Sequence, residues 1–250
     1  MSKHSKWAKI KRKKEVTDNK KGAAFTKLTN NITIAVKEGG GPDPDSNFKL
    51  RLTIDAARAQ NVPKENIERA IQRGAGKAGG AALEQLLFEG YGPEKIAVMV
   101  EATTDSRNRT VSEVKHLFTA GGGTMGGTGS VAWQFEKKGV IRISNFPALP
   151  AGRQFPISND IELALIDAGA DDIRTDDDII TILTAPEHLQ HLKEAVERLD
   201  LTIDEFNLEW IAKETIAISD PAAQERVAEF LQSLEEHDDV IAVFTNAALE

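Results

Sequence analysis

The chain has 250 residues, of which 40% are hydrophobic, so it can bury one to three cores and is not a disordered protein. It has no cysteine, which excludes disulfides, thiolate metal sites and thiol catalysis and agrees with a cytoplasmic location. The net charge of −8 conceals a strong division of charge along the chain.

Residues 1–80 carry 18 Lys and Arg against 8 Asp and Glu, a net charge of +10. Residues 81–250 carry 13 basic and 31 acidic residues, a net charge of −18. This asymmetry indicates that the N-terminal part contacts a polyanion. No apolar h-region follows the basic start, and the longest apolar run, 96–100, is too short to span a bilayer, so we expect neither a signal peptide nor a membrane partner.

The first segment is an arm dense in positive charge, opposed over residues 1–28 only by Glu15 and Asp18. Such density suits phosphate backbones, because each neutralised phosphate releases a counterion. Within the arm, Trp7 is expected either to stack on a base or to dock on the protein's own helices, and the whole arm could instead be a solubilising tail. The residues assigned to nucleic-acid binding here are Lys3, His4, Lys6, Trp7, Lys9, Lys11, Arg12, Lys13, Lys14, Lys20, Lys21 and Lys27.

Three helices are predicted next. Phe25, Leu28, Ile32 and Ala35 recur at helical spacing, and the sequence GGGP at 39–42 ends that helix. A second helix follows the cap residues Asp45 and Ser46, and Pro63 suits the first turn of a third helix that ends at Gly74. The small-residue segment 74–82 then predicts a domain boundary.

The second and third helices offer further cations that could extend the basic surface. An alternative is that they form ordinary surface ion pairs, since Asp55 lies between two arginines and Glu65 precedes Arg69 by four residues. These secondary nucleic-acid-binding residues are Arg51, Arg58, Lys64, Arg69 and Arg73.

Beyond the linker, short strands alternate with helices. Strands are predicted near 86–89, 95–102, 130–135, 139–144, 172–175, 179–183, 201–210, 214–218 and 240–245, and helices near 108–120, 159–168, 186–199 and 221–236. The order over 139–206 completes a split βαββαβ unit, and the segments 95–135 and 214–245 would together make a second one.

We therefore predict an α+β fold, with an N-terminal helical domain followed by two ferredoxin-like α/β domains, one inserted in the other. The domains would be residues 1–80, a discontinuous domain of 81–136 and 207–250, and an inserted domain of 137–206.

A second candidate anion site lies at Arg107, Asn108 and Arg109. Two arginines in the first turn of a helix are unfavourable beside its free N–H groups unless an anion binds, which predicts a phosphate or carboxylate site. The alternative is that the arginines pair with Glu101 or Glu113.

Three other motifs do not match known dinucleotide-binding or metal-binding patterns. The glycine-rich loop 121–129 contains G-x-G-x-x-G, but it follows a helix and precedes a strand, so a contact loop or a helix stop is the better interpretation than a dinucleotide site. The acidic clusters at 176–178 and 235–239 lack EF-hand spacing, and His188 and His191 lack the zinc-protease order. We predict no metal, no cofactor and no catalytic residues.

Several separated motifs closely resemble the YebC/PmpR family, to which the mitochondrial translational activator of cytochrome c oxidase is related. They are HSKW at 4–7, GGGPDPDSN at 39–47, PKENIERAI at 63–71, EGYGP at 89–93, DSRNRT at 105–110 and GSVA at 129–132. The resemblance implies a helical N-terminal domain plus two α/β domains, and a non-enzymatic factor in gene expression. Bacterial members are described as DNA-binding transcriptional regulators, others as ribosome-associated factors that assist translation of difficult sequences such as proline runs.

The resulting hypothesis is a cytoplasmic nucleic-acid-binding regulator, foremost a DNA-binding transcriptional regulator of the YebC type. The alternative is a ribosome- or rRNA-binding translation factor that relieves stalling, and a further one is an enzyme acting on a phosphorylated ligand at Arg107 and Arg109. No helix-turn-helix, zinc-finger or RNA-recognition sequence motif decides between DNA and RNA. Specific DNA readout would imply repeated half-sites and a homodimer, whereas rRNA would be recognised by shape and its 2′-OH groups.

Overall fold

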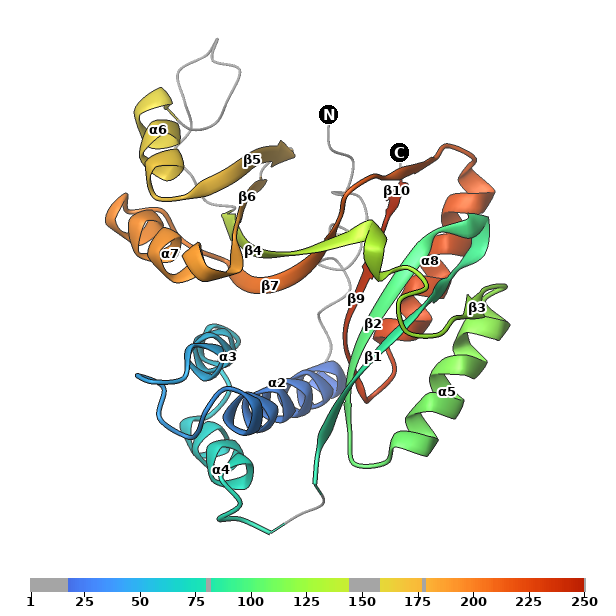
Figure 1. Ribbon diagram of the computed structural model, residues 1–250, viewed down its shortest axis with the longest axis horizontal. Helices are drawn as coiled ribbons and strands as arrows, with labels where there is room; N and C mark the ends of the chain where they lie inside the picture. The colour runs from blue at the N-terminus through green and yellow to red at the C-terminus, as the bar shows by residue number, and fades with distance from the viewer. Residues whose placement is uncertain (1–17, 80–81, 144–157, 177–178, 250) are drawn as a thin grey trace. The chain divides into compact units, whose positions relative to one another are not determined.

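The computed structural model describes residues 18–79, 82–143, 158–176 and 179–249 (Figure 1). The described residues form two compact units, one of residues 137–211 and the other of the residues up to Glu136 together with those from Ala212 onward. Helices and antiparallel sheets are both present, so the predicted α+β class with N-terminal helices is confirmed. None of the described helices has an apolar stretch of membrane-spanning length.

From residue 18, where the description of the chain starts, the larger unit has three helices in succession, α2 (Asp18–Glu38), α3 (Phe48–Ala59) and α4 (Lys64–Gly74). Helix α2 packs against both of the others (Figure 1). The predicted apolar stripe of α2 belongs to the core that the three helices share. The buried residues of the core are Ile32, Ala35, Val36, Leu50, Ile54, Ala57, Val62, Ile67 and Ala70.

The N-terminal cap of α3 is Asn47, so the prediction of Asp45 and Ser46 as caps was wrong. The Asn47 Oδ1 atom accepts a hydrogen bond from Leu50 N at 2.9 Å. Its Nδ2 atom donates to the carbonyl oxygens of Ala35 and Gly41, at 2.8 and 2.7 Å. Asn47 is 1% exposed, and its amide can both cap a helix and satisfy two carbonyl groups, which an exposed Asp or Ser cannot do.

The α/β part of the same unit is a four-stranded antiparallel sheet in the order β3-β1-β2-β9. Its strands are β1 (Glu84–Tyr91), β2 (Ala97–Thr104), β3 (Thr124–Met125) and β9 (Val240–Thr245). Helices α5 (Arg107–Ala120) and α8 (Pro221–Glu235) cover one face (Figure 1). Phe118 and Phe230 meet edge to face beneath the sheet, with ring centroids 5.4 Å apart.

Two predicted strands do not belong to this sheet. Residues 132–134 form a 3-10 helix, and β8 (Ile216–Ile218) pairs in parallel with β10 (Ala247–Leu249) in a separate two-stranded sheet. In the predicted ferredoxin-like unit, the third strand was residues 214–218. Strand β1 takes that place in the sheet instead. It pairs with β2 over its whole length, from Glu84 opposite Thr104 to Tyr91 opposite Ala97. A short hairpin closes with less loss of chain entropy than pairing with a distant segment, which favours β1 in this place.

The smaller unit has the predicted βαββαβ order, which is confirmed. It contains β4 (Phe135–Ile143), α6 (Asn159–Asp167), β5 (Ala170–Asp176), β6 (Ile179–Thr184), α7 (Leu189–Arg198) and β7 (Glu205–Ala212), with the strands in the order β5-β6-β4-β7. On β4, Arg142 forms ion pairs with Glu205 at 3.1 Å and Glu209 at 2.6 Å, both on β7. The predicted boundary of the helical domain near residue 80 stays a prediction.

Candidate nucleic-acid interface

Helices α3 and α4 are joined by only four residues, 60–63. Asn61 adopts a left-handed conformation with φ of 58°, a geometry that a short polar side chain tolerates, and Pro63 precedes the first turn of α4. Helix α2 packs against both of these helices. Two helices joined by a short turn and supported by a third are the elements that helix-turn-helix domains use to present a helix to the major groove.

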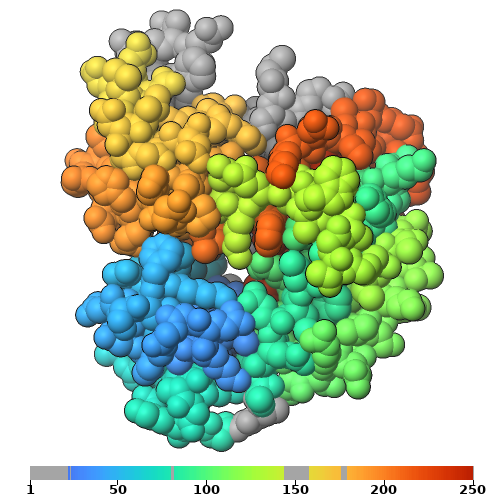
Figure 2. All heavy atoms as spheres, viewed as in Figure 1, coloured from blue at the N-terminus to red at the C-terminus, as the bar shows by residue number. Residues whose placement is uncertain are grey.

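Helix α4 has a clean division between an inner and an outer side. Ile67 and Ala70 are buried against the helical core. In Figure 2 the three N-terminal helices are coloured from blue at α2 to teal at α4. The exposed residues of α4 are Lys64, Glu65, Glu68, Arg69 and Gln72. Lys, Arg and Gln side chains of this kind contact base edges and phosphates in protein–DNA complexes.

The exposed cations of α3 and α4 are held only weakly by carboxylates. Arg58 lies 3.5 Å from Asp55, and Lys64 lies 3.7 Å from Glu68, with the two basic side chains 69% and 88% exposed. Exposed pairs of this kind contribute about 0–1 kcal/mol, so a phosphate can replace the carboxylate. Arg69 forms no ion pair with any residue that the structure describes.

Other predicted nucleic-acid-binding residues lie elsewhere. Lys27 donates from Nζ to the backbone oxygen of Glu235 at 2.7 Å, so its charge is directed at the C-terminal end of α8, the negative end of the helix dipole. Arg51 and Arg73 are only partly exposed. Outside the described residues lie Lys3, His4, Lys6, Trp7, Lys9, Lys11, Arg12, Lys13 and Lys14, and the side chains of Lys20 and Lys21 are likewise not described.

The predicted anion site at the start of α5 is occupied by carboxylates. Arg109 Nη2 lies 2.9 Å from Asp239 and 3.3 Å from Asp105, and its Nε atom lies 3.8 Å from Glu113. Arg107 lies 3.3 Å from Glu84, and Asn108 is exposed. Arg109 therefore forms internal ion pairs, the alternative to an anion site, with Glu113 among its partners as that alternative expected.

Asp239 is the strongest partner of Arg109. Its carboxylate also accepts a hydrogen bond from Thr110 Oγ1 at 2.6 Å. Burial raises the pKa of Asp239, but the hydrogen bonds from Thr110 and Arg109 outweigh it, so the pKa lies below its usual value. The ionised Asp239 neutralises Arg109, and any external anion would have to compete with it.

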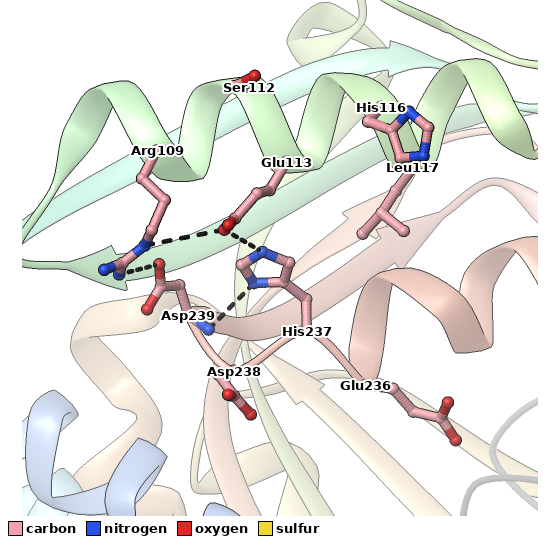
Figure 3. Close-up of a pocket in the computed structure, with 9 residues that line it drawn as sticks. All are labelled: Arg109, Ser112, Glu113, His116, Leu117, Glu236, His237, Asp238 and Asp239. Carbon is pink, nitrogen blue, oxygen red and sulfur yellow. Dashed lines mark hydrogen bonds and ion pairs between the residues drawn. The ribbon is translucent and has the colours of Figure 1, made fainter.

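A hollow beside α5 contains a cluster of Glu113, His237 and Asp239, each with one potential metal-ligating atom within 4.8 Å of the others (Figure 3). His237 Nδ1 accepts the backbone N–H of Asp239 at 3.1 Å, so the other ring nitrogen carries the proton and donates to Glu113 at 3.0 Å. The cluster is thus satisfied internally, and Arg109 already supplies its cation. Arg107 does not line the hollow, so the two arginines do not converge on one ligand.

The sequence analysis did not predict a role for Glu89 of β1, a buried residue that holds the glycine-rich loop of the α/β part. Glu89 is 3% exposed, and its carboxylate accepts the N–H groups of Gly129, Val131 and Ala132 at 2.7, 2.9 and 2.8 Å. Burial raises the pKa of Glu89, but these three bonds outweigh it and the pKa is lowered. The end of the glycine-rich loop is therefore held in one conformation by a buried charge.

Comparison with known proteins finds two matching family profiles. One is described as the TACO1/YebC protein N-terminal domain and matches residues 5–77, and the other as the TACO1/YebC second and third domain and matches residues 83–247. Two similar proteins, both named probable transcriptional regulatory proteins, come from Caldanaerobacter subterraneus and Chloroflexus aurantiacus. The first is 45% identical over 100% of this chain and 99% of its own length, and the second is 46% identical over 98% and 95%.

A solved structure is similar over most of the chain. It is the crystal structure of a conserved hypothetical protein from Aquifex aeolicus, with 40% sequence identity and a TM-score of 0.81. The similarity covers 93% of this chain and 92% of the other. The arrangement of elements described above is thus shared with an experimentally determined structure.

Proposed function

Because the chain belongs to the TACO1/YebC family, we propose that it is a cytoplasmic, non-enzymatic transcriptional regulator that binds duplex DNA through its basic arm and helix α4. The observation that carries this proposal is the α3–turn–α4 pair, whose outer helix exposes Lys64, Arg69 and Gln72. The names of the similar proteins from Caldanaerobacter and Chloroflexus support the same assignment.

The arm and α4 would have different tasks. The part of the arm that precedes α2, residues 1–17, carries seven Lys and Arg against one acidic residue, which suits sequence-independent attraction to phosphates. Helix α4 has Glu65 and Glu68 beside its basic residues, so its own charge is nearly balanced. We therefore assign affinity mainly to the arm and base recognition mainly to α4.

The second candidate function is a ribosome-bound translation factor that relieves stalling. It is favoured by the concentration of positive charge in the arm, since a lysine-rich arm binds rRNA as readily as DNA. The two functions differ in what α4 contributes. Duplex DNA requires base contacts from this helix, whereas rRNA binding would depend on the backbone and shape of the RNA.

The test is a binding measurement over a salt series, with a duplex DNA pool of randomised sequence and purified ribosomes as the two targets. The variant replaces Lys11, Arg12, Lys13 and Lys14 by Ala. A matched control removes four exposed charges of the α/β units, with Lys95, Lys115, Arg198 and Arg226 replaced by Ala. If all four arm residues contact DNA phosphates, the salt dependence of log K should flatten by about 3–4, while the control should leave it unchanged.

Recovery of one preferred DNA sequence from the pool, bound at physiological salt, would support the transcriptional function. Retention of ribosome binding at that salt while DNA binding fades would support the translational one. An arm variant that binds both targets like the unchanged protein would remove the role of the arm in either.

A further inference from the structure

Two aromatic side chains of the α/β part remain exposed. Tyr91 ends strand β1 and is 39% exposed, and Trp133 lies in the 3-10 helix Ala132–Gln134 and is 66% exposed. Aromatic rings are strong contributors to buried cores, so two of them left at the surface of one short region indicate a contact surface.

The two rings are fixed by the same acceptor. Tyr91 Oη donates to the backbone oxygen of Ser130 at 3.3 Å, and Trp133 Nε1 donates to that oxygen at 3.2 Å. The Tyr91 hydroxyl also accepts from Gln134 Nε2 at 3.4 Å. The polar edges of both rings are thus satisfied within the protein, and what they offer to a partner is their apolar surface.

The carbonyl that holds the rings is itself rigidly supported. Ser130 lies between Gly129 and Val131, whose N–H groups both bind the buried carboxylate of Glu89. The backbone of Glu89 also accepts the N–H of Gly126 at 2.7 Å. A surface held in place before binding loses less conformational entropy when a ligand arrives.

The fold itself does not require a glycine at position 127 of the loop. At Gly126 a Cβ atom would lie 2.4 Å from Ser130 Oγ, and Gly129 has a φ of +84°, so both positions favour glycine. At Gly127 a Cβ atom would meet nothing within 4 Å, and its φ is not in the left-handed region. The N–H groups of Gly127 and Thr128 have no partner among the residues the structure describes. Both residues are exposed, and the space where a side chain of Gly127 would lie is open, which leaves room for the close approach of an acceptor from a ligand.

A positive charge completes the surface. Lys213 donates from Nζ to the backbone oxygen of Trp133 at 2.9 Å, and its own N–H binds the backbone oxygen of Gln134 at 2.9 Å. An ammonium group is therefore attached to the same turn that carries the exposed indole, on a part of the chain that is acidic overall.

We propose that Tyr91, Trp133, the backbone of Gly127 and Thr128, and Lys213 form a binding site for an unpaired nucleotide of single-stranded nucleic acid. The base stacks on the exposed aromatic surface, and the phosphate takes the ammonium and the free N–H groups. This site goes beyond the proposed function, because it lies outside the arm and helix α4 and recognises an unstacked base instead of a duplex.

A proline-rich peptide also packs on exposed aromatic rings. The structure favours the nucleotide, because its phosphate is an anionic partner for the Lys213 ammonium beside Trp133, whereas a proline-rich peptide brings no anion to it. The two ligands make opposite demands on charge. Only the nucleotide binds less tightly as the salt concentration is raised, because only its phosphate releases counterions when it meets the ammonium.

The experiment measures fluorescence anisotropy of labelled oligo-thymidylate and oligo-uridylate over a salt series, with full-length protein carrying the four Ala substitutions in the arm. Trp133→Ala should weaken both oligonucleotides roughly tenfold at every salt concentration, because stacking is not screened. Trp133→Phe should restore most of the affinity. Lys213→Ala should instead flatten the salt dependence of log K by about 0.7.

Two matched controls separate this site from general effects. Leu163→Ala removes an apolar side chain of similar exposure, 60%, from α6 and should change nothing. Gly127→Ala should weaken binding, whereas Gly79→Ala, at an equally open glycine, should not. A preference for uridylate would assign the site to RNA, and equal binding would assign it to either nucleic acid.

Oligonucleotide affinity that Trp133→Ala leaves unchanged would overturn the proposal. So would a labelled proline-rich peptide whose binding depends on Trp133 while oligonucleotide binding does not. Neither result affects the proposed role of the arm, which is measured by the salt series in the protein with its arm intact.

Discussion

The carboxylate of Glu89 lies 2.7 Å from the backbone nitrogen of Gly129, forty residues further along the chain. This contact and its two neighbours, at Val131 and Ala132, turn a glycine-rich segment into a fixed surface loop. A segment with many glycines loses much chain entropy when it is ordered, so a strong, charge-assisted anchor is physically required.

Replacement of Glu89 by Gln should destabilise the protein by about 2 kcal/mol, since an amide cannot accept three N–H groups and leaves buried donors unsatisfied. The measurement is the free energy of unfolding from urea denaturation. Glu65→Gln, at an exposed position of α4, is the control and should change stability by less than about 0.5 kcal/mol. Equal effects of the two substitutions would show that the Glu89 anchor contributes nothing.

The stability difference between the unchanged protein and Glu89→Gln should depend on pH. The pKa of Glu89 is lowered from its ordinary value of 4.5, so near that pH the unfolded chain binds more protons than the folded one. The contribution of Glu89 is therefore fully present above the unfolded pKa and is lost as the pH falls through the folded pKa. Urea denaturation of both proteins between neutral and acidic pH measures this. A difference that grows on acidification would contradict the assignment.

Asp239→Asn should destabilise the protein more than Asp105→Asn, although both carboxylates pair with Arg109. The Asp239 side chain is 16% exposed and also binds Thr110, whereas that of Asp105 is 44% exposed. A less exposed, doubly bonded carboxylate is screened less by water. The midpoints of urea denaturation of the two variants give the comparison, and a larger loss for Asp105→Asn would refute it.

Asn47→Ala should cost about 2 kcal/mol, because it removes the cap of α3 and leaves the carbonyl groups of Ala35 and Gly41 without their donor. The exposed neighbour Ser46 is the control, and Ser46→Ala should be close to neutral. Loss of stability is again measured from denaturation curves. A larger loss of stability for Ser46→Ala than for Asn47→Ala would mean that Ser46 caps the helix, as predicted from the sequence.

Arg69→Ala should reduce the preference for a selected DNA sequence over random DNA by about 1–3 kcal/mol while changing the salt dependence by no more than about one ion. The reason is that α4 is assigned to base recognition and the arm to phosphates. Binding to both DNA types at several salt concentrations gives the two quantities, and Lys115→Ala on α5 is the control. A loss that is equal for both DNA types would reassign Arg69 to phosphate contact.

Local patterns of the sequence were sufficient for the positions of most helices, the α+β class and the division of charge at residue 80. Helical spacing of Phe25, Leu28 and Ile32 and the Pro63 signal depend on residues within one or two turns of each other, so they can be read without knowing the fold. The resemblance of separated motifs to one family added an expected domain organisation for nearly the whole chain.

Only the tertiary structure decided which distant groups meet. The pairing of Arg109 with Asp239, the anchor from Glu89 to Gly129 and the use of Lys27 at the end of α8 join residues 130, 40 and 208 positions apart. The same holds for β1, which takes the place in the sheet that the order of elements had given to 214–218. Periodicity and propensity act between near neighbours, whereas these contacts depend on how loop closure and core packing bring remote segments together.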